Sequence, residues 1–364
     1  MNIAAAANED MASLSNVLIY SAMAVYTLAF LAHITEWVFG SRSKVGRTAA
    51  ALTQHAVTAP TPAVTVTAAR KTGGTTVIER ADVTTRSTTA GRDVPDGPGA
   101  AAGDEKGELY GRIAISLTVL AFLVHLGGVV ARTLSVQRAP WGNMYEFSTT
   151  FSLVAVGGYL LFLTLGKNIR WIGLPLVTSV LLDLGLAVSV LYTDSDQLVP
   201  ALHSYWLWIH VSCAIISGAM FYLGALATVL YLFRDRYEAK LASAEGKQPG
   251  PAASSILGRL PSATSLDKFA YRINAVIFPL WTFTIIAGAI WAEAAWGRYW
   301  GWDPKETWSF ITWVAYACYL HARATAGWKG RKAAYLVLIA FACFIFNYYG
   351  VNMFITGLHS YAGV

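Results

Sequence analysis

The sequence predicts an all-α, polytopic membrane protein with about eight transmembrane helices. Of its 364 residues, 55% are hydrophobic and 13% are charged, and the mean hydropathy is +0.47. Soluble domains of ordinary composition carry about 25% charged residues. The apolar residues also fall into long stretches, and a bilayer core about 30 Å thick needs about 20 residues of apolar helix. Composition and segment length therefore indicate the same class.

Eight apolar stretches are long enough to cross a bilayer. They lie near residues 16–39, 113–132, 146–166, 171–192, 205–233, 273–293, 308–326 and 334–355. The fifth stretch is the longest, and the span inside it could be shorter than these limits.

Lys and Arg are concentrated in alternate loops, which indicates the orientation because cytoplasmic loops carry an excess of both. The basic loops follow the first, third, fifth and seventh stretches, whereas the other loops hold Arg132, Arg138, Arg298 and Lys305. We therefore expect both termini to be extracytoplasmic. The first stretch follows acidic residues instead of a positive segment, so we expect a retained helix and not a cleaved signal peptide. The expected location is the cell (plasma) membrane.

The chain divides into three expected regions. Residues 1–40 form an N-terminal transmembrane helix, residues 41–110 form a disordered cytoplasmic insertion, and residues 111–364 form the main membrane domain. The insertion is rich in Thr, Ala, Gly and Arg, so it has too few large apolar residues to bury a core. Residues 240–262 are expected to be a second, shorter linker.

The charge and the cysteines exclude several classes of function. The net charge of +6 does not predict nucleic-acid binding, because the basic residues form short runs between apolar stretches. Cys213, Cys318 and Cys343 are far apart in apolar surroundings, so they form neither a redox pair nor a zinc framework. The chain has no Cys-x-x-Cys-His sequence and is therefore not itself a c-type cytochrome.

The most informative segment is the tryptophan loop, WGRYWGWDPKETW at residues 296–308, which is expected on the outer face. It contains Trp296, Tyr299, Trp300, Trp302 and Trp308. An aromatic belt at the membrane interface is the simpler explanation for a single ring. Five rings within thirteen positions, with glycines that let the backbone bend, favour a surface for a flat apolar macrocycle.

The polar residues of this loop have structural and functional interpretations. Asp303, Pro304 and Glu306 match an N-cap, a proline at the first helical position and the third-position acid of a capping box. Capping would explain both acids without a catalytic role. Arg298 and Lys305 could pair with carboxylates of a ligand, such as haem propionates, or could be solvated at the surface.

Histidine is the commonest nitrogen ligand of haem iron. His210 lies near the outer end of the fifth stretch and His359 lies just beyond the eighth, so both are expected at the face of the tryptophan loop. Two imidazoles that approach opposite faces of one ring would give six-coordinate iron.

Other histidines are expected at different depths. His321 lies about eleven residues, or roughly 16 Å of helix, beyond Phe310 and so near mid-membrane. An intramembrane histidine is a functional hypothesis by default, and a neutral side chain bonded to a neighbouring helix is the alternative. His33 and His125 carry the same two interpretations. His203 is a secondary candidate beside His210.

The tryptophan loop and its surroundings resemble the haem-handling WWD region of the CcsA/ResC family of system II cytochrome c biogenesis. The matching segments cover most of the chain from about residue 111. They are residues 140–146, 198–202, 204–206, 210–211, 266–267, 271–272, 288–293, 296–313, 319–323, 349–352 and 357–361. The ending Asp-Pro-Lys-Glu distinguishes this family from the system I haem proteins.

The resemblance implies a function and roles for residues. His210 and His359 match the two extracytoplasmic ligands of haem b, which is bound non-covalently as a substrate. The WWD loop, residues 291–308, would hold it through aromatic residues and Asp303. His321 matches an intramembrane haem ligand whose second ligand belongs to a ResB-like partner protein. The expected activity is that of a cytochrome c haem lyase, which attaches haem to the Cys-x-x-Cys-His motif of apocytochrome c.

Two other functions remain open from the residues alone. One is a haem transporter with attachment elsewhere. The other is a haem b electron-transfer subunit, which would need histidine pairs at matched depth inside the bundle.

Overall fold

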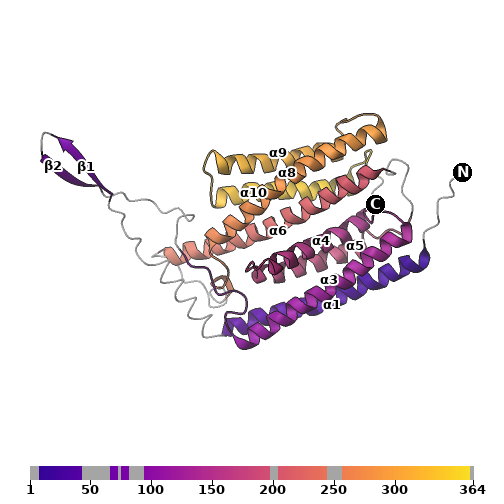
Figure 1. Cartoon of the computed structure of the whole chain (residues 1–364), viewed down its shortest axis with the longest axis horizontal. Helices are drawn as coiled ribbons and strands as arrows, with labels where there is room; N and C mark the ends of the chain where they lie inside the picture. Colours follow the sequence, from indigo (N-terminus) through magenta and orange to yellow (C-terminus); the bar gives the residue numbers. More distant parts are fainter. Residues whose placement is uncertain are drawn as a thin grey trace.

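The chain forms a bundle of long helices that lie roughly side by side (Figure 1). A computed structural model describes residues 8–42, 66–72, 75–81, 94–196, 204–243 and 256–360. The long helices are α1 (Glu9–Arg42), α3 (Glu105–Val136), α4 (Met144–Thr164), α5 (Gly173–Ser189), α6 (Tyr205–Ala242), α8 (Ala263–Trp296), α9 (Pro304–Ala324) and α10 (Arg331–Ile345). This arrangement confirms the prediction of an all-α, polytopic membrane protein.

Seven helices in the described part of the chain are long and apolar enough to span a membrane. The eighth expected span corresponds to α9, which has 21 residues but several Thr, Ser, Trp and Tyr side chains that lower its hydropathy. α9 packs against α8 and α10. It therefore belongs to the bundle although its composition alone does not qualify it as a span.

Several helices extend beyond the apolar stretches. α6 has 38 residues and α8 has 34. α6 continues to Ala242, so the expected linker at 240–262 is shortened at its start, whereas its end agrees with the start of α8 at Ala263. Ser262 caps α8 by accepting a hydrogen bond from the Ser265 amide. Polar residues extend these helices beyond the apolar span. Hydropathy does not detect such polar helix ends.

The expectation of a wholly disordered insertion at 41–110 is wrong for the segments that the structure describes. β1 (Val66–Thr72) and β2 (Thr75–Ala81) form an antiparallel hairpin. Residues 94–104 pack on the bundle, with Ala100 and Ala102 buried. The Arg259 guanidinium donates to the Ala100 and Trp37 carbonyl oxygens. α3 begins at Glu105, so the expected boundary at residue 110 lies inside a helix.

The last expected span is divided into three segments. α10 is followed by η4, a π-helix (Phe346–Gly350), and then by the short α11 (Val351–Phe354). A π-turn adds a residue to one helical turn and changes the direction of the side chains that follow. Here it directs Asn347 and Tyr348 into the cavity described below.

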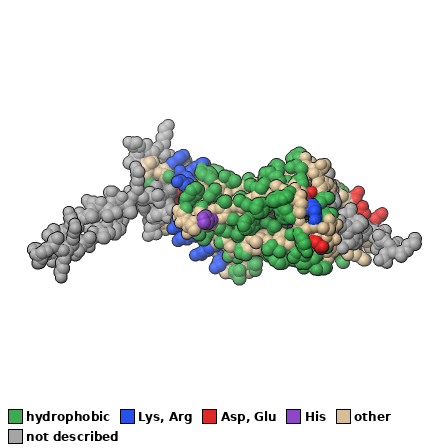
Figure 2. Space-filling model, turned by 90° about the horizontal axis from the view of Figure 1, so that it is seen from above, with side chains coloured by type: hydrophobic (Ala, Val, Ile, Leu, Met, Phe, Trp, Pro, Cys, Tyr) green, Lys and Arg blue, Asp and Glu red, His purple; other side chains and the backbone are tan. Residues whose placement is uncertain are grey.

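Hydrophobic side chains cover the middle of the bundle, while Lys and Arg gather at the end opposite most of the Asp and Glu (Figure 2). The tryptophan loop joins α8 to α9 at the less basic end of the bundle (Figure 1). The Lys and Arg that the orientation argument counted as inner include Lys167, Arg170, Arg236, Lys268 and Lys329. The charge distribution in space therefore follows the one in the sequence.

Candidate functional site

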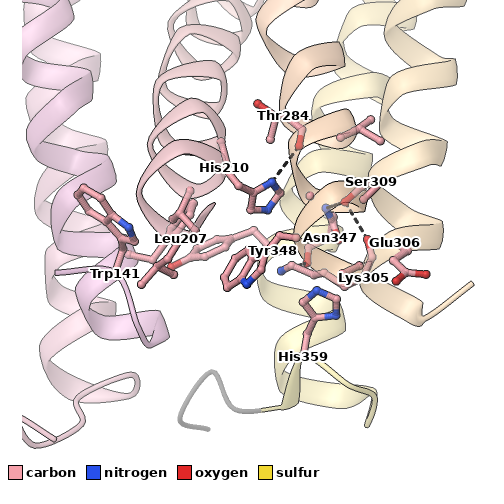
Figure 3. A pocket seen from close by; sticks show the side chains of 18 of the residues that line it. Trp141, Leu207, His210, Thr284, Lys305, Glu306, Ser309, Asn347, Tyr348 and His359 are labelled. Atoms are coloured by element: carbon pink, nitrogen blue, oxygen red, sulfur yellow. Dashed lines mark hydrogen bonds between the residues drawn. The ribbon is translucent and has the colours of Figure 1, made fainter. Parts of the chain in front are cut away.

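A cavity opens at the end of the bundle that carries the tryptophan loop (Figure 3). Its walls come from α4, α6, α8, α9, α10, η4, α11 and the tryptophan loop, and most of the lining side chains are apolar or aromatic. His210 and His359 both line it and, in Figure 3, approach from opposite sides with Tyr348 and Lys305 between them. The structure thus brings together two histidines that are 149 positions apart in the sequence.

His210 is held in one orientation by α8. Its Nδ1 lies 2.8 Å from the Thr284 carbonyl oxygen, which can only accept, so Nδ1 carries the proton and Nε2 carries the lone pair. The ring also contacts the edge of Trp291 at 5.7 Å between centroids. Gly288 makes room for it, because a Cβ there would lie 2.7 Å from His210 Cε1.

His359 is oriented by a carboxylate. Its Nδ1 lies 2.7 Å from Asp303 Oδ2, and its ring meets the edge of Trp296 at 5.0 Å. When Nδ1 donates to Asp303, the neutral imidazole keeps its metal-binding lone pair on Nε2. A carboxylate behind a histidine is a common support for metal ligation, because it fixes the tautomer and raises the ligand's basicity.

Asp303 therefore has two functions, of which the sequence indicated one. The expected capping box is confirmed: Asp303 accepts from the α9 backbone and Glu306 accepts from the Asp303 amide. Asp303 also accepts hydrogen bonds from His359 and, at 2.7 Å, from the Leu358 amide. Burial by itself raises the pKa of the Asp303 carboxyl, but these hydrogen bonds outweigh it and hold the pKa below its ordinary value. The contact across 56 residues had no sequence signal.

Glu306 holds the tryptophan loop in place through hydrogen bonds. Besides its capping bond, it accepts from the Gly301 amide at 2.8 Å and from the Arg298 guanidinium at 3.1 Å. Arg298 is thus paired inside the loop. The loop geometry depends on this buried carboxylate, which supports a structural role for Glu306.

Lys305 is placed differently from Arg298. Its Nζ donates to the Asn347 carbonyl at 2.9 Å and to Asn352 Oδ1 at 3.1 Å, and its side chain lines the cavity. It therefore places an amine inside the cavity, beside the two histidines. Burial lowers the pKa of this ammonium to about 7, and the nearby Asp303 carboxylate opposes that shift. A carboxylate on a cavity ligand would find its counter-charge here.

The aromatic residues of the loop separate into two groups. Trp296, Tyr299 and Trp300 line the cavity. Trp302 does not: it is 64% exposed, has a left-handed backbone with φ of 58°, and packs against Phe310. Trp308 instead contacts Phe346 at 4.2 Å. Trp302 and Trp308 therefore do not line this cavity with the other three rings: Trp302 lies in the turn before α9, and Trp308 lies within α9. A haem contact of Trp302 stays a prediction.

His321 lies outside this cavity. α9 begins at Pro304, so His321 is in its last turn, about 25 Å along the helix. The helix starts six residues before Phe310, so His321 lies farther along α9 from the tryptophan loop than the sequence indicated. Its depth in the membrane stays a prediction. Its side chain is exposed on the bundle surface, at the end away from the tryptophan loop.

His33 and His125 are fully buried elsewhere in the bundle. His33 Nδ1 bonds Glu36 at 3.3 Å, and His125 Nδ1 lies 3.5 Å from the Tyr26 hydroxyl. Neither lines the cavity, and both fit the alternative of a histidine bonded to neighbouring side chains. His203 lies outside the described residues.

Fold and site define a class: a multi-pass membrane protein with an aromatic cavity at one membrane face and two oriented histidines inside it. A family model described as "Cytochrome C assembly protein" matches residues 114–359. The chain belongs to this family and, within it, to the CcsA cytochrome c biogenesis proteins.

Three CcsA relatives illustrate the similarity. The chain is 38% identical over 273 residues to the "Cytochrome c biogenesis protein CcsA" of Trieres chinensis, which covers 68% of this chain and 84% of the relative. It is 35% identical to that of Synechococcus sp. (strain JA-3-3Ab), with 70% and 84% covered. For the Synechocystis sp. protein the identity is 35%, with 68% and 86% covered. The protein therefore acts in cytochrome c biogenesis, which implies haem handling.

Proposed function

We propose that this protein delivers haem to the outer face of the cell membrane and attaches it covalently to apocytochrome c, together with a ResB-like partner. One observation carries the proposal: His210 and His359 line one cavity, and each has its Nδ1 occupied by an acceptor that leaves the lone pair on Nε2. That arrangement fits two axial ligands of one haem iron.

The remaining walls of the cavity fit the same substrate. Trp296, Tyr299 and Trp300 offer flat apolar faces to a macrocycle. Lys305 supplies a cation for a propionate. Bis-histidine ligation inside the membrane, which an electron-transfer subunit needs, has no support from the buried histidines, because His33 and His125 lie apart from one another against different partners.

The protein's own contribution to the reaction is position. In thioether formation a cysteine thiol of the Cys-x-x-Cys-His motif adds across a haem vinyl group. The S–H bond and the π bond of the vinyl C=C are broken, one C–S bond and one C–H bond are formed, and nothing leaves. When the haem ring is held in one orientation, the vinyl group and the thiol meet in fixed positions. This lowers the entropic part of the activation barrier. His210, His359 and the aromatic walls provide that orientation, and no side chain need act as nucleophile.

The ResB-like partner is proposed to cover the exposed face of α9. Phe310, Val314 and His321 follow one another along this face and are all exposed. A histidine facing lipid is unfavourable, and α9 is also the least apolar of the long helices. A partner helix that covers this face would shelter His321 and could supply a second ligand to an iron there.

Holocytochrome c formation tests the proposal directly. The chain is co-expressed with its ResB-like partner and an apocytochrome, and covalent haem is measured by haem staining and mass. His210→Ala and His359→Ala should each abolish the product, and His210→Gly or His359→Gly should recover part of it with added imidazole. Normal product in both alanine variants would refute the ligand assignment.

A haem transporter without attachment activity is the second candidate function, and an experiment can distinguish it from a haem lyase. The purified complex, ferrous haem and a Cys-x-x-Cys-His peptide are incubated together. We expect a peptide with the mass of haem added. Haem bound by the complex without any such product would favour transport alone.

A further inference from the structure

A second cavity lies inside the bundle next to the first, between α4, α5, α6 and α10. Its volume is about 270 Å³. Six aromatic rings line it: Phe151, Tyr222, Phe341, Phe344, Tyr348 and Tyr349. All of its walls come from segments that qualify as membrane spans. Leu182, on its α5 wall, is 71% exposed and marks the side that faces lipid.

Asp183 on α5 is the only acidic side chain among the residues that line this cavity. No ion pair to Asp183 occurs in the described part of the chain. Hydroxyl groups surround it instead. Tyr349 donates to Oδ1 at 2.5 Å, Ser148 to Oδ1 at 3.3 Å and Ser152 to Oδ2 at 2.5 Å. An ionisable residue within a membrane-spanning helix indicates a function.

The hydrogen-bond inventory of Asp183 leaves room for a ligand. A carboxylate offers about four acceptor positions, two on each oxygen. The three hydroxyl donors occupy both positions of Oδ1 and one of Oδ2. Oδ2 can therefore accept one more donor from the cavity. A fitting ligand has a hydroxyl that donates, a flat ring for the aromatic walls, and enough apolar surface to arrive through lipid.

The two cavities share walls. Phe344 and Tyr348 line both. The Tyr348 hydroxyl lies 2.9 Å from the Ser148 hydroxyl, which in turn donates to Asp183. A ring in the second cavity would therefore be separated from a haem in the first by aromatic side chains and a short hydroxyl chain.

We propose that the Asp183 cavity binds a membrane-soluble hydroquinone that reduces the haem iron held between His210 and His359. The binding half of this inference stands on the second cavity alone, and the reduction half rests on the proposed function. Asp183 is the group that recognises the reduced form, because a hydroquinone has a hydroxyl to donate and a quinone has none.

The step balances as follows. The hydroquinone is oxidised to the quinone and loses two electrons and two protons. Two ferric haems, bound one after the other, each take one electron and become ferrous. One proton passes from the ring hydroxyl to the Asp183 carboxylate, and the second leaves with water at the outer face. The quinone, which no longer donates a hydrogen bond, returns to the bilayer.

Binding is tested first, on the haem-free full chain in detergent, with decylubiquinol as the probe under anaerobic conditions. Dissociation constants are measured by equilibrium dialysis. We expect Asp183→Asn and Tyr349→Phe to weaken binding at least tenfold. Ser189→Ala is the matched control, because Ser189 is on the same helix, is exposed, and has a hydroxyl that donates to the Gly185 carbonyl of that helix. Its affinity should equal that of the unmodified chain.

Three results would overturn the binding half. One is equal affinity in all variants, which would place the probe elsewhere. Another is equal affinity for decylubiquinol and decylubiquinone, which contradicts recognition through a donated hydroxyl. The third is displacement of the probe by sodium ions, which would make Asp183 a cation site. Helical content by circular dichroism ensures that a weakened variant is folded.

Reduction is tested second, on chain loaded with ferric haem. Addition of decylubiquinol should produce the ferrous absorption bands, and Asp183→Asn should slow their appearance at least tenfold while the ferric spectrum stays unchanged. Equal rates in both proteins would refute the reduction step. A chain that binds decylubiquinol but never binds haem would refute the proposed function and leave the quinol site standing.

Discussion

Asp303→Asn separates the two functions of one residue. Asparagine is as good an N-cap as aspartate, so α9 should still begin at Pro304. The amide lacks the charge that strengthens the 2.7 Å contact to His359 Nδ1. Loss of an outer partner of a metal-ligating histidine typically lowers metal affinity 10- to 100-fold. We therefore expect haem affinity to fall by that factor, or by about 1.4–2.7 kcal/mol.

The assay for this prediction compares haem binding with stability. Haem is titrated into each purified protein and followed by absorbance, and the midpoint of thermal unfolding is measured on the haem-free chain. Asp303→Ala should lose haem affinity and also about 1 kcal/mol of stability through the missing cap. Asp104→Asn is the matched control, because Asp104 caps α3 in the same way, far along the chain from the site.

The outcome can contradict the reasoning in two ways. Unchanged haem affinity in Asp303→Asn would mean that His359 does not depend on the carboxylate. An equal loss of affinity in Asp104→Asn would mean that general destabilisation, and not the histidine contact, lowers haem binding.

Two further predictions follow from the same site. Gly288→Ala should lower haem affinity at least tenfold, because the new Cβ would lie 2.7 Å from His210 Cε1. Gly185→Ala on α5 meets no atom within 4 Å and should leave haem titrations unchanged; equal losses in both variants would refute the steric argument. The second prediction concerns pH and the low pKa of Asp303. A carboxyl whose pKa is lowered by folding stabilises the folded state above its ordinary value of 3.8 and loses that contribution as the pH falls through the lower folded value. The difference in unfolding midpoint between the unmodified chain and Asp303→Asn should therefore be constant above pH 3.8 and shrink below it; a difference that shrinks between pH 7 and pH 5 would contradict this.

The sequence predicted the spans better than their ends. Apolar stretches located every long helix, because helix length in a bilayer is set by its thickness. Their ends were displaced where polar residues continue the helix, as at α6, α8 and α9. Because α9 starts earlier than the apolar stretch, His321 lies in the last helical turn. Sequence patterns predicted the structure correctly where neighbouring residues cause it. The capping box at Asp303, which marks the start of α9, is the example.

Contacts between distant residues were outside the reach of local patterns. Asp183 lies in an apolar stretch where a single aspartate is itself an unusual signal, yet the hydroxyls that surround it come from other helices. The contact from Asp303 to His359 likewise depends on how the end of the chain returns to the start of α9.

By itself the sequence determined the class of protein, the family, the approximate spans and the membrane face at which the tryptophan loop is expected, because composition, length and charge act along the chain. The tertiary structure decided which of the aromatic residues share a cavity with His210 and His359, what fixes the tautomer of each histidine, and that a buried carboxylate lies beside them. These depend on the packing of α4, α5, α6, α8 and α9, and side-chain direction at such contacts follows from the relative position of helices and not from the residues within one of them.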